Sequence, residues 1–436
     1  MKKIALVLAL FASVAFANAQ NVKSEAAAKS ALESAKAAAS NAKKATKVAT
    51  WLKLASSYMD AYNAPAGNGW IGGSAQELAL VMGNQKPQES NVEINGTQYL
   101  KKAYNSADYY FNQNGQLAII KVTKPIVEDA LAQALSAYEN AYKNDPKGTK
   151  TADIISGIET ISDKMVQEAY DAYTLGEPAK ASELFEAAAK ALATAPCSKV
   201  DSNSLYNAGF TAWAAEDYSR AKNFFQKCLD VKYYGDDGDV YAKLADVTGK
   251  LGDQEGLKNI LEEGFAVYPS SQAILIGLIN YYTASGDDTD RLFTLLDGAK
   301  KNEPDNASLY YVEGNIYKEL GKLEEAVASY RKCAEVNPEY EFGYIGEGLL
   351  RYNEAFEIQE QAQAELDDAK YMVLAEKFDT ALKACIPPLE KAIELTKDES
   401  NKSGIAEFLK NACYRYREED PSYQQKYEKY SAMCAQ

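Results

Sequence analysis

The chain has 436 residues, no histidine and a formal net charge of −15 at pH 7. Without histidine, the histidine-based catalytic triads and the His-Glu-x-x-His zinc helix are excluded. The acidic balance disfavours nucleic acid and anionic lipid as partners. A chain of this length can form two or three ordinary domains or one long array of repeats.

The first nineteen residues have the pattern of a secretory signal peptide. Lys2 and Lys3 precede an apolar stretch, 4–16, which is too short to span a bilayer comfortably, and a small-x-small cleavage site ends at Ala19. We expect cleavage after Ala19 and export, with the periplasm as the expected location. Loss of the two lysines would take the net charge from −15 to −17. No cysteine precedes Cys197, so we expect no lipid anchor, and no direct membrane insertion.

Residues 20–47 form an alanine-rich lead-in. The segment is rich in alanine, lysine and serine and has almost no large apolar residue. This composition favours a helix with weak packing, which acts either as a solvated lead-in or as a partner-binding helix.

Residues 48–146 contain two helical stretches. Apolar and small residues recur at helical spacing from Trp51 to Tyr58 and again from Ala134 to Ala141. We expect these two helices to pack against each other as a pair.

An insertion at about 63–126 separates the two helices. It begins with a glycine-rich loop, after which the apolar period falls from 3.6 to about 2. Asn95-Gly96 and Asn114-Gly115 each lie between strand-like runs, which is the strongest short-range signal for a β-hairpin. We expect a small β-containing insertion that either caps the exposed end of a helical array or serves as a docking element.

Helical pairs then recur through residues 147–340. Pro304 and Pro338 are 34 residues apart, and Pro269 lies 35 residues before Pro304. Small and aromatic residues recur at fixed offsets before these prolines. A fixed period of this size indicates a repeat architecture.

The stretch EGNIYKELGKLEEAVASYRKCAEVNP, residues 313–338, shows the pattern most completely. Gly314 and Ala326 are small enough for two helices to approach closely, Tyr330 fills the space beside them, and Gly321 falls at the turn. This stretch resembles a tetratricopeptide repeat, whose period is 34 residues.

The resemblance implies an all-α fold, a right-handed α-solenoid of about seven tetratricopeptide helix pairs, with the small β-hairpin-containing insertion in the first repeat. It covers about 48–397. The last repeat, 341–400, contains an extended, polar helical insertion. Residues 401–436 are expected to form capping helices at roughly 402–417 and 421–433.

The resemblance also places candidate partner-binding residues at the groove-lining positions of the first helices. These candidates are Tyr206, Asp239, Asp246, Asn280, Tyr311, Asn315 and Lys318. Tyr311 and Asn315 are favoured because the core positions of their repeat are already filled. Phe210 and Trp213 occupy similar positions, but they could equally pack against the adjacent repeat.

The family's chaperone-binding members hold a C-terminal dicarboxylate with a lysine at the position that Tyr311 occupies here. The groove is also partly acidic, so we do not expect that dicarboxylate clamp in this chain. The resemblance therefore does not imply a cytosolic chaperone as partner.

The cysteines and acidic runs indicate no further site. Cys228 and Cys333 occupy positions where repeats place alanine, which favours buried thiols over disulfides. Cys413 and Cys434 are the one pair that we consider for a disulfide. The runs 235–239 and 285–290 lack the ligand spacing of a calcium loop and fall where aspartate caps helices. We expect no metal and no cofactor.

The sequence therefore predicts a non-catalytic scaffold of the bacterial cell envelope that binds a protein or extended peptide through its concave groove. The signal resembles those of exported Bacteroidetes proteins. The alternative is a glycan-binding envelope protein whose groove aromatics stack on sugar rings.

No P-loop, dinucleotide fingerprint or nucleophile elbow is present in the sequence. An enzyme using carboxylates alone would instead need a deep pocket with clustered carboxyls of shifted pKa. The partner's identity, the oligomeric state and the role of the insertion stay open.

Overall fold

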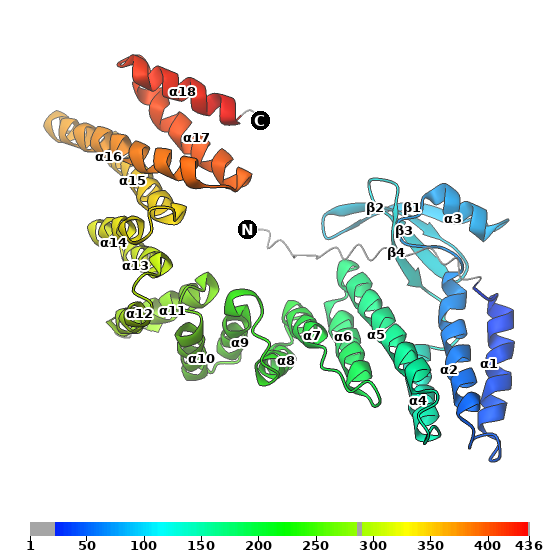
Figure 1. Cartoon of the computed structure of the whole chain (residues 1–436). Coiled ribbons are helices and arrows are strands. Elements are labelled where there is room, and N and C mark those ends of the chain that lie inside the picture. The colour runs from blue at the N-terminus through cyan, green and yellow to red at the C-terminus, as the bar shows by residue number, and fades with distance from the viewer. Residues whose placement is uncertain (1–21, 286–289, 435–436) are drawn as a thin grey trace. The chain divides into compact units, whose positions relative to one another are not determined.

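The computed structural model describes residues 22–285 and 290–434 (Figure 1). Within these residues the chain forms eighteen α-helices, two short 3-10 helices and one four-stranded sheet. The predicted signal peptide, 1–19, and most of the acidic run 285–290 lie outside the described residues. The predicted all-α fold with a small β insertion is confirmed.

The chain divides into two compact units, Met1–Tyr233 and Tyr234–Gln436. The array expected over 147–340 is therefore split between two units. The split falls where Tyr233 takes the place of the proline that ends other repeats, and a 3-10 turn, η2 (Asp236–Gly238), follows it.

The first unit consists of helical pairs with a sheet inserted in the first pair. Its elements are α1 (Glu25–Ala39), α2 (Val48–Asn63), η1 (Ala64–Ala66), α3 (Ala75–Met82), β1 (Gln88–Ile94), β2 (Thr97–Ala103), β3 (Ala107–Phe111), β4 (Leu117–Val122), α4 (Ala130–Lys143), α5 (Thr151–Thr174), α6 (Pro178–Ala193), α7 (Ser202–Ala214) and α8 (Tyr218–Asp230). The pairs are α2 with α4, α5 with α6 and α7 with α8. Fully buried alanines such as Ala55, Ala134 and Ala188 allow the close approach.

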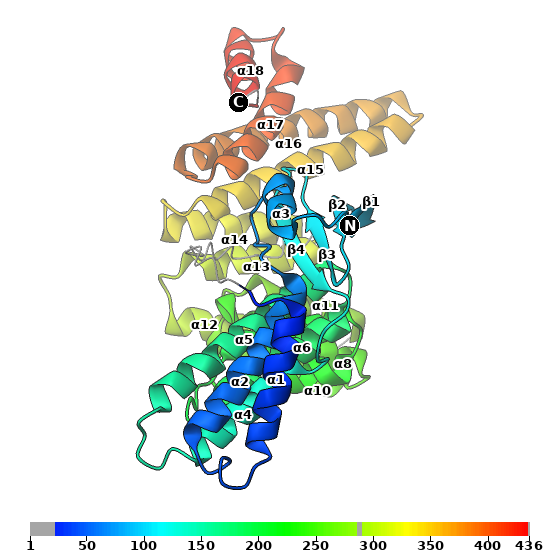
Figure 2. The ribbon, with the colours of Figure 1, turned by 90° about the vertical axis from the view of Figure 1, so that its right-hand side faces the viewer.

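Helix α1 packs more closely than its composition predicts. It lies beside α2 (Figure 2) and buries Ala28, Leu32 and Ala35. Alanines on its inner face bring the two backbones close, so a single large side chain, Leu32, is enough to join the core.

The sheet is a simple antiparallel meander in the order β1-β2-β3-β4. Asn95 and Gly96, with φ of 51° and 78°, form the two-residue turn that joins Ile94 to its partner Thr97. The second predicted hairpin, β3 with β4, is also present and contains a register irregularity at Phe111. Both hairpin predictions are confirmed.

Contacts at several points hold the sheet to the helices. Leu78 of α3 joins Tyr109 and other β-strand residues in one core cluster, so α3 covers a face of the sheet. Lys121 of β4 pairs with Glu177 at 2.5 Å, just before α6. Asn95 donates a hydrogen bond to the carbonyl of Thr174 at the end of α5. The insertion therefore packs on its own unit.

The second unit is helical throughout its described residues. Its helices are α9 (Asp239–Lys250), α10 (Gln254–Val267), α11 (Gln272–Ser285), α12 (Asp290–Asn302), α13 (Ala307–Glu319), α14 (Leu323–Val336), α15 (Glu341–Ala364), α16 (Asp368–Leu395), α17 (Glu399–Tyr416) and α18 (Pro421–Cys434). The last two lie close to the expected capping helices. No helix in the described parts of the chain is both long and apolar enough to cross a bilayer.

The pair α13–α14 has the predicted packing. A Cβ on Gly314 would lie 2.5 Å from the Tyr330 ring, so the absence of a side chain there lets α14 approach α13. Ala326 and Cys333 are fully buried on the inner face of α14. The repeat interpretation of this stretch is confirmed.

Candidate functional site

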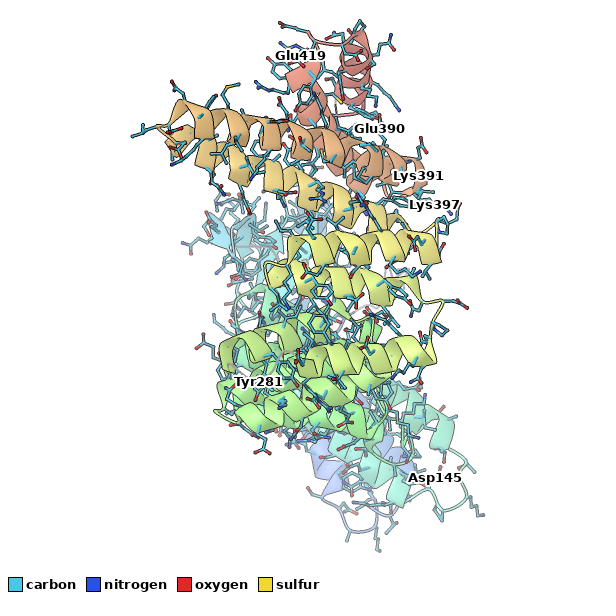
Figure 3. All side chains as sticks on the ribbon, turned by 90° about the vertical axis from the view of Figure 1, so that its left-hand side faces the viewer. Asp145, Tyr281, Glu390, Lys391, Lys397 and Glu419 are labelled. Carbon is cyan, nitrogen blue, oxygen red and sulfur yellow. The ribbon has the colours of Figure 1, made fainter. Side chains whose placement is uncertain are left out.

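A surface hollow of about 510 Å³ lies in the second unit where α10 meets α9 and α11. The lining residues are Ala242, Ala245, Asp246, Gln254, Leu257, Leu261, Gly277, Asn280, Tyr281 and Ala284. Figure 3 labels Tyr281 on its helix. Both helices of the pair α9–α10 and the first helix of the next pair, α11, thus line one hollow.

Small residues create this hollow. A Cβ on Gly277 would lie 2.8 Å from Leu261, so α11 approaches α10 closely. Ala242, Ala245 and Ala284 leave space beside that contact because they have no side chain beyond Cβ. The floor is therefore apolar, while exposed polar groups stand at the rim, a combination typical of binding sites.

A buried anchor beside the hollow fixes α11. The hydroxyl of Tyr282 donates a 2.6 Å hydrogen bond to Glu262, which also pairs with Arg291 at 2.8 Å. Burial, together with Glu262, raises the pKa of Tyr282. Tyr281 is only half-buried and meets Tyr282 edge to face at 5.4 Å. The neighbouring Tyr282 therefore holds Tyr281 at the hollow.

The structure brings two of the predicted groove residues together in this hollow. Asp246 of α9 and Asn280 of α11 are both exposed and both line it. Asp239, also predicted, is the first residue of α9, with its carboxylate 3.9 Å from Lys243, and it does not line the hollow. Their roles in binding a partner stay predictions.

The favoured candidates of α13 have packing roles within their repeat. The half-buried ring of Tyr311 lies 5.8 Å from that of Tyr330 and 5.7 Å from that of Phe342. Asn315 accepts a 2.8 Å hydrogen bond from the Tyr330 hydroxyl. Lys318 is exposed and lies 3.1 Å from Glu319. None of these three candidates lines the hollow.

The candidate aromatics of α7 pack mainly on other rings. Tyr206 lies 6.0 Å from Phe225 and 5.9 Å from Tyr233. Phe210 lies 6.0 Å from Tyr173 of the preceding pair, as the packing alternative predicted, and 5.9 Å from Trp213. Rings used in this way contribute less surface to a sugar-stacking site.

Sequence reasoning missed Tyr281 and Gln254 at the hollow. Gln254 begins a second helix, whereas the groove rule considers only first helices. The Tyr281-Tyr282 pair was a usable signal, because adjacent helical positions point in directions about 100° apart, which turns one of the two rings toward the edge of the buried face.

A cluster of titratable groups lies in the first unit. Burial raises the pKa of Asp171 to about 7, while a 2.9 Å hydrogen bond from Gln167 opposes this rise. Burial also raises the pKa of Glu168, and burial together with Glu168 raises that of Tyr62. Such clusters occur at catalytic sites and in structural networks alike. In the described residues, no group of three or more acidic or cysteine side chains is arranged to hold a metal ion.

The six cysteines are free thiols. Cys228 and Cys333 are fully buried, as predicted, and Cys413 and Cys434 form no bridge. Burial raises the pKa of Cys333 to about 12, so this thiol is inert at neutral pH.

Comparison with known proteins identifies the repeats directly. The tetratricopeptide repeat family model matches residues 202–233, which include α7 and α8, and 307–340, which include α13 and α14. No curated protein matches the chain significantly.

Among solved structures, similar chains include a TPR-repeat protein from Bacteroides fragilis, at 19% identity and a TM-score of 0.25, covering 58% of this chain and 97% of that one. A tetratricopeptide repeat protein from Parabacteroides merdae has 17% identity and a TM-score of 0.31, covering 58% and 98%. The human IFIT1 dimer with m7Gppp-AAAA has 16% identity and a TM-score of 0.31, covering 69% and 64%. These similarities are too low to transfer a site or ligand to this chain. The family match shows a tetratricopeptide repeat in each of the two units, at α7–α8 in the first and at α13–α14 in the second.

Proposed function

We propose that the chain is a non-catalytic scaffold that binds an extended segment of a partner protein at the hollow on α9, α10 and α11. This proposal rests on one observation: the hollow has an apolar floor, and the polar side chains of Asp246, Asn280 and Gln254 surround it. A bound segment loses water from its backbone N–H and C=O groups, and these groups then need hydrogen-bond partners. Amide side chains such as Asn280 and Gln254 supply both donors and acceptors.

The charge of the chain disfavours one kind of partner. Asp246 provides a carboxylate at the hollow, and the chain as a whole is acidic. The net charge of −15 disfavours a partner rich in phosphate groups. Protein is therefore the proposed partner, and nucleic acid is not.

We place this scaffold in the cell envelope because residues 1–19 have the pattern of a signal peptide. Fusing residues 1–30 to a reporter enzyme that is active only after export tests this location. Activity of the fusion supports the proposal, and an inactive but stable cytosolic fusion contradicts it.

Peptide selection from a random library tests the binding function and does not require the partner to be identified first. Peptides selected on the full chain should bind at least about tenfold more weakly to an Asn280→Ala/Tyr281→Ala variant, since hot-spot truncations of about 1.4 kcal/mol have this effect. Ile276→Ser is the matched control, because Ile276 is exposed on the same helix but does not line the hollow. Equal loss in the control, or no loss in the double variant, contradicts the proposal. Selective binding of an oligosaccharide instead of peptides would favour the glycan alternative.

A further inference from the structure

The pair α15–α16 is longer than its neighbours and continues beyond the helix that covers it. The helices have 24 and 28 residues, against 13 and 14 in α13–α14. Tyr416, the last residue of α17, donates a 3.0 Å hydrogen bond to Asp379 of α16. The part of α16 before Asp379 therefore lies past the end of α17, and Figure 1 shows the orange α16 projecting there beside the yellow α15.

The projecting part exposes large apolar side chains. Met372 is 66% exposed, Val373 is 53% exposed, and Leu366 at the tip is 96% exposed. Met372 and Val373 belong to one open surface that follows this part of α16. Its lining residues are Met372, Val373, Ala375, Glu376, Asp379, Thr380 and Lys383. Apolar side chains this exposed commonly mark an interaction surface when they lie together.

The exposed residues continue the face that receives α17. Met372, Glu376 and Asp379 are spaced as one stripe of a helix, and Asp379 contacts α17. On α15, the exposed ring of Phe356 lies 4.7 Å from that of Tyr352, which in turn lies 4.9 Å from Phe408 of α17. A surface already shaped for one helix thus continues, uncovered, beyond it.

The sequence that forms this part of the pair is acidic, and Lys383 also borders the surface. Residues 353–377 contain seven acidic side chains and two lysines. One of the seven, Glu354, is paired with Arg351 at 2.8 Å. Glu357, Glu360 and Glu376 are exposed. Complementarity therefore calls for basic side chains on whatever binds here.

We propose that this distal face, formed by Met372, Val373, Ala375 and Glu376, docks an amphipathic helix of a partner protein whose polar face is basic. The partner's apolar side chains, spaced i, i+3, i+4 and i+7, would lie along the α16 stripe. Its lysines or arginines would face the surrounding carboxylates. This surface shares no residue with the hollow on α9–α11, so the scaffold would have two separate attachment points.

Two synthetic helices test this proposal. One is a fluorescently labelled amphipathic helix of leucine and lysine, and the other has glutamate in place of lysine. Anisotropy titration with the full chain should show binding of the Leu/Lys helix only, at least tenfold weakened by Met372→Ser/Val373→Ser. The matched control is Leu80→Ser/Val81→Ser, which removes exposed apolar residues from α3 and should leave binding unchanged.

The Met372→Ser/Val373→Ser variant keeps every charge, so merely electrostatic attraction would leave it with full affinity, and that result overturns the proposal. Equal binding of the Leu/Glu helix also overturns it. Concentration-dependent dimers in sedimentation that the variant abolishes would assign the face to a second copy of this chain instead. Circular dichroism checks that the variant folds. Peptides selected on the α9–α11 hollow should still bind it, which separates this test from that of the proposed function.

Discussion

The pairs α13–α14 and α15–α16 follow one another in the second unit and differ in what they do with their surfaces. In α13–α14 the small residues, the rings and even the candidate groove side chains Tyr311 and Asn315 take part in packing. In α15–α16 the same kind of packing holds the part near α17, where Leu389 and Cys385 are fully buried. The helical turns of α15 and α16 that lie beyond α17 do not pack against it, and apolar side chains there are exposed.

This difference shows how a repeat protein separates stability from recognition. Residues at repeat positions are constrained by the neighbouring helix, so changing them alters the fold. Exposed residues in an extension or at the rim of a hollow, such as Met372 and Asn280, are less constrained by packing and can be shaped for a partner.

Removing the Tyr330 side chain should have the largest effect on the regular pair. Tyr330→Ala deletes a fully buried ring that touches Gly314 and Tyr311 and bonds to Asn315, and should cost about 3–5 kcal/mol of unfolding free energy. Urea unfolding followed by circular dichroism measures this loss. Tyr330→Phe is the control and should cost only about 1 kcal/mol, the value of the hydroxyl's hydrogen bond. Equal losses would mean that the ring itself is not an anchor.

Adding a methyl group where the helices approach should have a smaller effect. Gly314→Ala would place a Cβ 2.5 Å from the Tyr330 ring and should destabilise the unit by about 1–3 kcal/mol. Gly404→Ala on α17, where a Cβ meets nothing within 4 Å, should instead stabilise by up to about 1 kcal/mol. Thermal unfolding should therefore show a lower melting temperature for Gly314→Ala and a higher one for Gly404→Ala. If both substitutions lower the melting temperature equally, packed and open positions do not differ in the way proposed here.

The first unit extends the comparison to charge. Folding raises the pKa of Asp171 to about 7 from its usual value of 3.8, and Glu168 shifts in the same direction. The folded chain thus retains protons that the unfolded chain releases. This contribution to stability is fully present below about pH 4 and is lost as the pH rises through about 7, with a slope of at most about 1.4 kcal/mol per pH unit for one such group.

Measuring the melting temperature between pH 4 and 8 at constant ionic strength tests this dependence. In the Asp171→Asn variant the melting temperature should fall less steeply as the pH rises, because the amide does not titrate. A variant with the wild-type slope would show that Asp171 is not the group responsible.

The smallest effect on stability is expected at the tip of α15–α16. Leu366→Ser changes an almost fully exposed side chain and should alter the unfolding free energy by less than about 0.5 kcal/mol. A loss above 1 kcal/mol in urea unfolding would show that the tip belongs to the folded core, and the contrast with α13–α14 would then fail.

The parts of the fold that could be predicted are those set by local spacing. Gly314, Ala326 and Tyr330 recur at helical intervals, and Asn95-Gly96 specifies its turn without help from distant residues. The packing of Phe342 onto Tyr311 could not be predicted, because it depends on where α15 starts relative to α13.

Two of the ten residues that line the candidate hollow could be predicted as site residues. Asp246 and Asn280 occupy groove positions that a repeat template supplies. Gln254 and Leu257 enter from a second helix, and their contribution depends on the small side chains of α9 and α11 that let α10 come close. Such a depression is set by contacts between helices rather than by any one helix.

In-cell crosslinking from a photoreactive residue at position 280 tests the central claim most directly. The matched control position is 276, which is exposed on the same helix but outside the hollow. We predict that a single dominant partner protein is captured from position 280 and not from position 276. Capture of the same proteins from both positions, or of none from position 280, would contradict the assignment of the hollow as the binding site.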